Sequence, residues 1–131
     1  METSKIPPEL RYTKTHEWVR LDGTTATVGI TDHAQAQLTD IVFVDLPAVG
    51  KAVQHGTPAL VLESVKTVAD IYAPGDGTIA AVNTDLKSHP ELVNQDPYGR
   101  GWLVRITLAA PIDPAALLAA DAYRQQLERG D

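Results

Sequence analysis

The residue best placed for chemistry is Lys66, which ends the stretch Glu63-Ser64-Val65-Lys66. Short runs rich in Val, Ile and Leu flank this stretch at 60–62 and 68–72, and both predict strands. Lys66 is therefore expected at or beside the turn of a hairpin, where its amine stays in water. An exposed lysine is usually a replaceable surface residue, so the surrounding pattern has to decide whether this one has a function.

The sequence offers little support for an enzyme. No serine lies in a Gly-x-Ser-x-Gly motif, and no two of the four histidines have helical metal-ligand spacing. Three of these histidines fall in polar segments, so we expect them at the surface. Ser64 follows a strand, whereas phosphopantetheine carriers place their serine at the start of a helix. The chain has no cysteine, so any redox chemistry must come from a cofactor.

Length and charge narrow the class of protein. We interpret residues 1–131 as a single domain, with an irregular lead-in at 1–9. The net charge of -6 disfavours nucleic acid and anionic membranes as partners, because phosphate binding needs clustered positive charge. No apolar run approaches the roughly 20 residues that span a bilayer. The N-terminus lacks an apolar signal-peptide core, so we expect a cytoplasmic protein, or a mitochondrial matrix protein if this is a processed eukaryotic chain.

The elements around Lys66 are predicted to be short strands separated by Gly and Pro turns. Alternating residues predict a strand at 25–30, and Thr31-Asp32 predicts the start of a helix that ends at Leu38. Asp113-Pro114 predicts the start of a C-terminal helix over 113–128. The other expected elements are strands at 12–20, 41–46, 51–53, 78–82 and 102–108, and one helical turn at 90–92. This order predicts a mainly β fold, a sandwich of two antiparallel sheets with short helices and a C-terminal helix.

The turns around the hairpin carry a family resemblance. Val49-Gly50-Lys51-Ala52-Val53 precedes the hairpin, and Ala73-Pro74-Gly75-Asp76-Gly77 follows it. This arrangement resembles the biotinyl and lipoyl carrier domains, in which such a lysine accepts a swinging cofactor. Biotin carriers place the lysine between two methionines, whereas Met1 is the only methionine of this chain. The resemblance is therefore to the lipoyl carriers.

A more specific resemblance extends from about Leu10 to the C-terminal helix. Glu63-Ser64-Val65-Lys66, followed by Asp70-Ile71-Tyr72-Ala73-Pro74, resembles the H protein family of the glycine cleavage system. Further segments that fit this family are 12–19 (Tyr-Thr-Lys-Thr-His-Glu-Trp-Val), 28–35, 40–47, 90–94, 96–99 and 101–103. The chain departs from the family at Thr39, where glycine is usual, and at Thr67 and Ala69 after the lysine.

The resemblance implies a function for the whole chain. It implies a carrier, not an enzyme, with lipoate covalently attached to Lys66. The carrier would take the aminomethyl group of glycine from the decarboxylase, a pyridoxal phosphate enzyme, to the aminomethyltransferase, which uses tetrahydrofolate. Dihydrolipoyl dehydrogenase would then reoxidise the dithiol, and a lipoate-attaching enzyme would load the lysine. We expect the carrier to be a monomer.

Three carboxylates are expected to have roles that support Lys66. Glu63 lies at a fixed offset from Lys66 and is expected to help the attaching enzyme recognise the hairpin. Glu17 matches an acidic position of the family, and Asp70 lies four residues beyond Lys66; both are expected to help dock the loaded arm. From the residue pattern alone, Glu17 and Asp70 are better interpreted as solvated residues of a strand edge.

Two other functions stay open at this point. The chain could be a related carrier that relays lipoate or serves another sulfur pathway, since such proteins share the fold and the lysine. It could also be an interaction module that has lost its cofactor, although the retained Glu63 and Lys66 argue against this.

Overall fold

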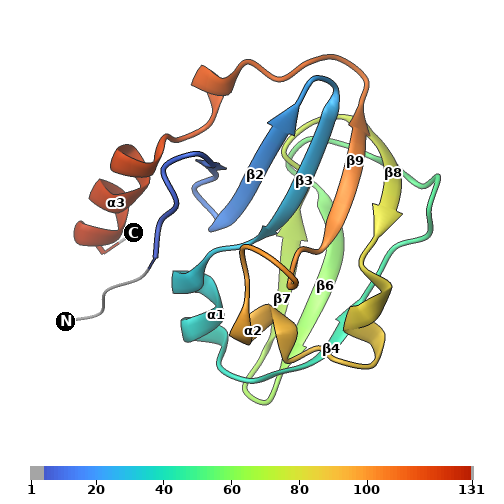
Figure 1. Cartoon of the computed structure of the whole chain (residues 1–131), viewed down its shortest axis with the longest axis vertical. Helices are drawn as coiled ribbons and strands as arrows, with labels where there is room; N and C mark the ends of the chain where they lie inside the picture. The colour runs from blue at the N-terminus through green and yellow to red at the C-terminus, as the bar shows by residue number, and fades with distance from the viewer. Residues whose placement is uncertain (1–4, 131) are drawn as a thin grey trace.

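Two antiparallel sheets make up the computed structural model, which describes residues 5–130. The larger sheet has the strand order β1-β2-β3-β9-β8-β5, and the smaller has the order β4-β6-β7 (Figure 1). The strands are β1 (Arg11–Tyr12), β2 (Glu17–Asp22), β3 (Thr25–Ile30), β4 (Ile41–Asp45), β5 (Ala52–Val53), β6 (Pro58–Ser64), β7 (Val68–Tyr72), β8 (Gly77–Val82) and β9 (Val104–Leu108). The predicted sandwich of two antiparallel sheets is confirmed.

Short helices connect these strands. They are α1 (Asp32–Leu38), the 3-10 helix η1 (Thr84–Lys87), α2 (Leu92–Gln95), the 3-10 helix η2 (Pro114–Ala116) and α3 (Ala120–Glu128). The predicted helix after Thr31 is confirmed: the Thr31 hydroxyl accepts a hydrogen bond from the backbone N–H of Ala34 at 3.2 Å and so caps α1. In the described residues, no helix is long and apolar enough to cross a membrane.

The core lies between the inner faces of the two sheets. In β3 the predicted alternation holds, with Ala26, Val28 and Ile30 buried. They join a cluster to which the small sheet contributes Leu62 and Ile71. A second, aromatic cluster lies at the edge of the larger sheet, where α3 packs, and contains Leu10, Tyr12, Trp18, Ala120 and Tyr123.

The strand predicted at 12–20 is wrong in one respect, because the chain leaves the sheet in its middle. Tyr12 ends β1, residues 13–16 form a turn, and Glu17 begins β2. Within this turn His16 has a φ of 73°, a left-handed conformation that few residues with a side chain adopt. The sequence did not reveal the turn, because its threonines are also common in strands.

The helix predicted over 113–128 is also partly wrong. Asp113 does cap the first turn, accepting from the backbone N–H of Ala115 at 2.9 Å, but that turn is the 3-10 helix η2. The chain is then extended until α3 begins. Leu118 explains the interruption, since its N–H and C=O both bond to the backbone of Tyr12 at 2.8 Å. A distant strand thus takes the backbone groups that a continuous helix would have used.

The connection between β8 and β9 has more helix than expected. The sequence predicted one helical turn at 90–92, whereas η1 precedes this point and α2 begins only at Leu92. Leu86, Leu92 and Val93 of these turns are buried in the main core cluster, and this packing holds the turns in place.

Candidate functional site

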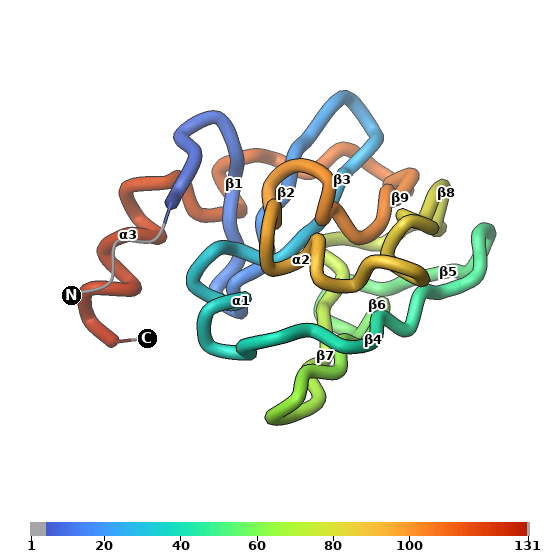
Figure 2. The backbone as a smooth tube through the Cα atoms, turned by 60° about the horizontal axis from the view of Figure 1, so that its bottom comes forward, coloured from blue at the N-terminus to red at the C-terminus, as the bar shows by residue number. Residues whose placement is uncertain are grey.

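The lysine hairpin is the most prominent projection of the small sheet. Strands β6 and β7 pair from Pro58↔Tyr72 to Glu63↔Val68, and Lys66 lies in the turn between them, as predicted. In Figure 2 this turn is the light-green loop that extends below the rest of the tube. Val65, Lys66, Thr67 and Val68 are all exposed. The lysine amine is therefore accessible to another protein.

Ser64 gives the turn a fixed shape. Its hydroxyl accepts the backbone N–H groups of Lys66 at 3.1 Å and Thr67 at 3.0 Å, and its own N–H donates to Thr67 O at 2.8 Å. A serine that bonds backbone groups two and three residues later stabilises a tight turn locally. These hydrogen bonds give Ser64 a structural role that requires no cofactor on it. They also fix the backbone position of Lys66, whose side chain stays exposed.

The turn also rests on the connection between α1 and β4. The backbone N–H of Val65 donates to Asp40 O at 3.0 Å, and Lys66 Nζ lies 3.4 Å from Gln37 O. The second contact is long for a hydrogen bond, so it holds the lysine amine only loosely. The hairpin backbone is thus fixed at its tip, while the lysine side chain keeps its freedom.

Exposed apolar side chains surround this tip. Phe43, the only phenylalanine in the sequence, is 51% exposed, and Val68 is 62% exposed. Strand register places Phe43, Glu63 and Val68 side by side on one face of the small sheet. An exposed apolar patch next to a single projecting residue is typical of a protein docking surface.

A cavity of about 450 Å³ lies along the side of the molecule between the sheets and the C-terminal segment. This volume is within the range of small-molecule sites. Its walls are mostly apolar, and Glu17 supplies a carboxylate; the lining includes Tyr12, Thr15, Glu17, Tyr72, Pro74 and Leu117. The C-terminal segment around Leu117 forms one wall, so its extended backbone helps to shape the cavity.

Glu17 is only 1% exposed, so the interpretation as a solvated strand edge is wrong for this residue. Its Oε1 accepts the hydroxyls of Thr13 and Thr15, and its Oε2 accepts the backbone N–H of Tyr72 at 3.3 Å. Burial raises the pKa of the Glu17 carboxyl, and the Thr13 and Thr15 hydroxyls and the Tyr72 N–H partly oppose this increase. A carboxylate fixed in this way, at an apolar cavity, is suited to bind a cationic amine.

Asp70 is exposed, as expected for a solvated residue of a strand edge, and it does not line the cavity. It lies on β7 between Lys66 and Tyr72, whose N–H reaches Glu17. At about 3.3 Å per residue, Asp70 is roughly 13 Å and Tyr72 roughly 20 Å along the strand from Lys66. Strand β7 thus runs from the Lys66 turn to the cavity, and Asp70 lies on this strand between the two.

Three of the four histidines were predicted to lie at the surface, but not all of the histidines are surface residues. His16 is half-buried, its Nδ1 lies 2.7 Å from the Tyr123 hydroxyl, and its ring lies 4.9 Å from that of His33. Among the described residues, no group of three His, Cys, Asp or Glu could hold a metal. Trp18 is a buried core residue, whereas Trp102 is partly exposed, with the guanidinium of Arg105 4.3 Å from its ring centre.

Several residues of the site were missed from the sequence. Thr13 and Thr15 hold the Glu17 carboxylate, and their spacing of two residues, within four residues of a glutamate, was the available signal. Tyr123 lies within the predicted C-terminal helix, and nothing in the sequence showed that its hydroxyl reaches His16, 107 positions away in the chain. Contacts over that distance depend on the topology and carry no local pattern.

The chain was compared with known families and structures. Residues 10–130 match the family described as Glycine cleavage H-protein. The glycine cleavage system H protein of Rubrobacter xylanophilus is 53% identical, over 95% of this chain and 97% of that protein. That of Cronobacter sakazakii is 54% identical, over 95% of this chain and 98% of that protein.

A solved structure gives the same result. The crystal structure of a glycine cleavage system H protein from Mycobacterium marinum superposes with a TM-score of 0.86 at 40% identity. The match covers 94% of this chain and 99% of that one. The segments on which the resemblance was based, from 12–19 to 101–103, all lie within the matched residues. The chain therefore belongs to the glycine cleavage H-protein family.

Proposed function

We propose that Lys66 is the residue that carries lipoate, in amide linkage, and that its arm visits the cavity that contains Glu17. The observation that supports this most strongly is an exposed lysine on a rigid turn that projects from a sheet edge. Membership of the family makes the chain a lipoyl-bearing carrier component of the glycine cleavage system and not a catalyst.

The residues present fit a lipoyl group. When attached to Lys66, the group would supply a disulfide that is reduced as one sulfur takes up the aminomethyl group of glycine, and it would stay on the lysine as a dithiol that needs reoxidation. Acylation of Lys66 Nζ replaces an ammonium by an uncharged amide. The modified side chain can then enter a mostly apolar cavity without the cost of desolvating a charge.

Within the cavity, the chain's own groups would hold the cargo. Thr13, Thr15 and Tyr72 keep the Glu17 carboxylate in one position, so it needs little reorganisation to accept the N–H groups of a cationic amine. The apolar walls, among them Leu117 and Pro74, would exclude water from the cargo. We propose that Asp70 assists only while the arm passes along β7, because it is exposed and outside the cavity.

The proposed partners are the glycine decarboxylase, the aminomethyltransferase, dihydrolipoyl dehydrogenase and a lipoate-attaching enzyme. Each must reach Lys66, and the exposed Phe43, Val65 and Val68 around the turn offer an apolar surface for brief docking. Glu63 lies between Phe43 and Val68 and is exposed, which supports its proposed contact with the attaching enzyme. The cytoplasm is the proposed compartment, and cell fractionation with an antibody to the chain tests it.

Reconstitution tests the proposal. The chain would be lipoylated in vitro and combined with the decarboxylase, aminomethyltransferase and dehydrogenase of a relative, and release of carbon dioxide from glycine would be measured. Lys66→Arg should abolish activity, because a guanidinium cannot be acylated in this way. Lys87→Arg is the matched control, an exposed lysine in η1, and should keep full activity. Activity in Lys66→Arg would show that another residue carries the group.

A further inference from the structure

The direction of the Glu17 side chain depends on the residue before it. His16 has the left-handed φ of 73°, its N–H donates to Thr13 O at 3.2 Å, and its C=O accepts the N–H of Thr31 at 3.1 Å. This conformation turns the chain from the Thr13–Thr15 loop into β2. Since Glu17 follows directly, the backbone of His16 determines how the carboxylate enters the cavity.

The side chain of His16 is held by the C-terminal helix. Its Nδ1 lies 2.7 Å from the hydroxyl of Tyr123, and that hydroxyl is also 2.7 Å from Thr31 Oγ1. Thr31 in turn caps α1. One hydroxyl of α3 thus joins the turn before Glu17 to the start of α1.

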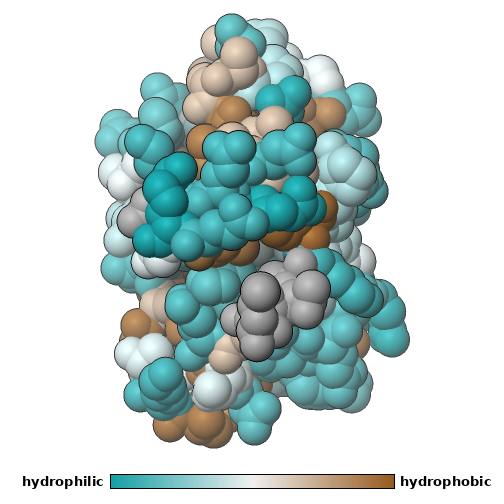
Figure 3. All heavy atoms as spheres, turned by 90° about the vertical axis from the view of Figure 1, so that its left-hand side faces the viewer, coloured by the Kyte–Doolittle hydropathy of each residue, from teal (hydrophilic) through white to brown (hydrophobic). Residues whose placement is uncertain are grey.

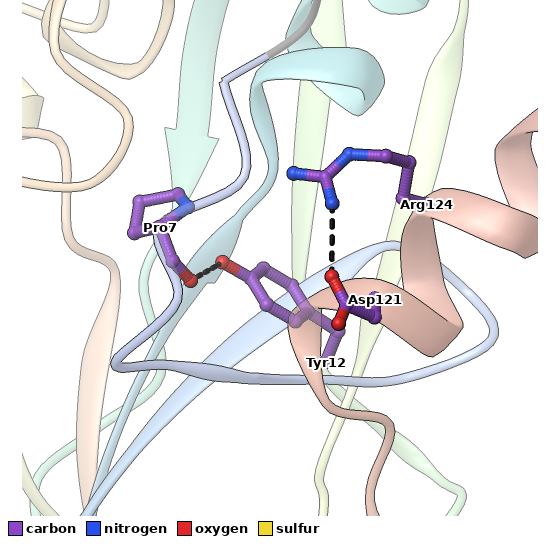
Figure 4. A network of polar contacts seen from close by, with 4 residues as sticks. All are labelled: Pro7, Tyr12, Asp121 and Arg124. Carbon is purple, nitrogen blue, oxygen red and sulfur yellow. Dashed lines mark hydrogen bonds and ion pairs between the residues drawn. The ribbon is translucent and has the colours of Figure 1, made fainter.

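Several contacts fix α3 against the segment around Glu17. The ring of Tyr123 stacks on that of Tyr12, with centres 4.8 Å apart and planes at 8°. Tyr12 also donates its hydroxyl to Pro7 O at 2.5 Å (Figure 4), and Gln126 Nε2 donates to Lys14 O at 3.0 Å. Arg124 of α3 bonds Asp121 of the same helix (Figure 4). The face of the molecule on which α3 lies is mainly hydrophilic (Figure 3).

We infer that Tyr123 is a positioning residue, which acts through His16 to hold the Glu17 carboxylate in the cavity. The inference rests on the proposed function, since it assigns Glu17 a role toward the arm's cargo. It also gives the C-terminal segment two tasks: Leu117 and Leu118 form a wall of the cavity, and Tyr123 fixes its carboxylate.

Tyr123→Phe is the direct test, because it keeps the buried, stacked ring and removes only the hydroxyl. The first readout is the pKa of the Glu17 carboxyl, measured by a ¹³C NMR titration of the unlipoylated chain. Burial raises this pKa in the wild type. A looser turn would admit water, so the pKa should fall toward its ordinary value in Tyr123→Phe. Tyr98→Phe is the control, since it also removes a hydroxyl that bonds α1, through Asp32 N, but this hydroxyl donates to Lys5 O and not to His16.

The second readout is loss of the cargo from the loaded chain, measured as ammonia and formaldehyde without the folate enzyme. In this hydrolysis water adds to the carbon, and the carbon–sulfur bond breaks with its electron pair going to sulfur, which takes up a proton. The aminomethanol so formed then loses ammonia, as its carbon–nitrogen bond breaks with the electron pair going to nitrogen, and formaldehyde is left. Tyr123→Phe should speed the loss about three- to tenfold, the range for one net hydrogen bond. In the Glu17→Gln background it should have no further effect, because its action passes through Glu17.

The outcomes separate this inference from the proposed function. An unchanged pKa of Glu17 in Tyr123→Phe would overturn the inference, and so would an equal acceleration of cargo loss in both backgrounds, which indicates a structural role only. If Glu17→Gln alone leaves cargo loss unchanged, the proposed role of the cavity fails. The NMR titration still decides in that case whether Tyr123 positions Glu17.

Discussion

At the scale of single residues, Glu17 is the side chain whose burial changes its interpretation most. The sequence alone favoured a solvated carboxylate, and the structure places it almost fully inside the protein. A buried carboxylate needs donors, and Thr13, Thr15 and Tyr72 provide them. Burial of this kind follows from the turn at His16, which the strand pattern around it did not indicate.

Glu17→Gln should let the cargo escape about tenfold faster or more, because a charge-assisted hydrogen bond contributes roughly 1.5–3 kcal/mol. Asp70→Asn should have a small effect, less than about fivefold, since exposed charges contribute roughly 0–1 kcal/mol. Release of ammonia from purified, loaded protein measures both. Glu128→Gln, at the exposed end of α3, is the control. Equal rates in all variants would return both carboxylates to ordinary surface or structural roles.

The stability of the fold should depend on pH through His16. Burial, together with the nearby ring of His33, lowers the pKa of His16 in the folded protein. Between that value and about 6.5, the unfolded chain binds the proton more readily, so the stability that depends on neutral His16 is complete above pH 6.5 and declines below it.

His16→Asn should remove this dependence and keep the turn, because Asn tolerates a left-handed φ. Urea unfolding at pH 7.5 and pH 5.5 measures the free energy of unfolding of both proteins. The wild type should lose more stability between the two pH values than the variant does. Parallel losses would mean that His16 is not the titrating group.

At the scale of elements, the connection from α1 to β4 supports the lysine turn and contains a strained residue. Thr39 has a φ of 63° and a ψ of -152°, a region that is almost restricted to glycine. It also stands where the resembled family usually has glycine. The next residue, Asp40, accepts the N–H of Val65, and Gln37 contacts Lys66, so the strain lies in the segment that supports the Lys66 turn.

Thr39→Gly should therefore stabilise the protein by about 1 kcal/mol, the relief of strain less the extra entropy of an unfolded glycine. Thr57→Gly is the matched control. Thr57 is also exposed and also donates its hydroxyl to a backbone carbonyl, that of Gln54 at 2.7 Å, but its φ is not positive. It should lose stability. Destabilisation by both substitutions would show that Thr39 is not strained.

The turn itself gives the next prediction. Glu63 is exposed in β6, beside Phe43 and Val68, and its side chain makes no hydrogen bond or ion pair with another residue of the described part of the chain. Glu63→Ala should therefore slow lipoylation several-fold without lowering the melting temperature. Mass spectrometry over time with the attaching enzyme measures the rate. Asp45→Ala, an exposed carboxylate on the same face of the small sheet, is the control. Unchanged kinetics in Glu63→Ala would leave Glu63 without a role in recognition.

At the scale of the whole molecule, the sequence predicted those elements whose causes are local. Alternation identified β3, the cap at Thr31 identified α1, and the turn residues identified the hairpin that carries Lys66. The errors occurred where distant backbone segments meet. Leu118 pairs with Tyr12 across more than a hundred residues and interrupts the C-terminal helix, and nothing in residues 113–128 indicates this.

The candidate site also has a part with a local cause, which the sequence predicts, and a part that depends on the fold. Lys66 could be predicted because neighbouring residues of one hairpin form the turn that presents it, although Asp40 also supports that turn. The cavity could not, because it forms where β2, β7 and the C-terminal segment come together. The sequence therefore indicated the proposed point of attachment, and the structure was needed to find the cavity proposed for the far end of the arm.

Mass spectrometry can show whether Lys66 carries lipoate. The chain would be produced in lipoate-replete cells that contain other lipoyl proteins, and intact mass and peptide fragments would be measured. We expect one lipoyl group per chain, on the peptide that contains Lys66, and no modification of Lys66→Arg. An unmodified Lys66, in cells whose other lipoyl domains are modified, would contradict the account.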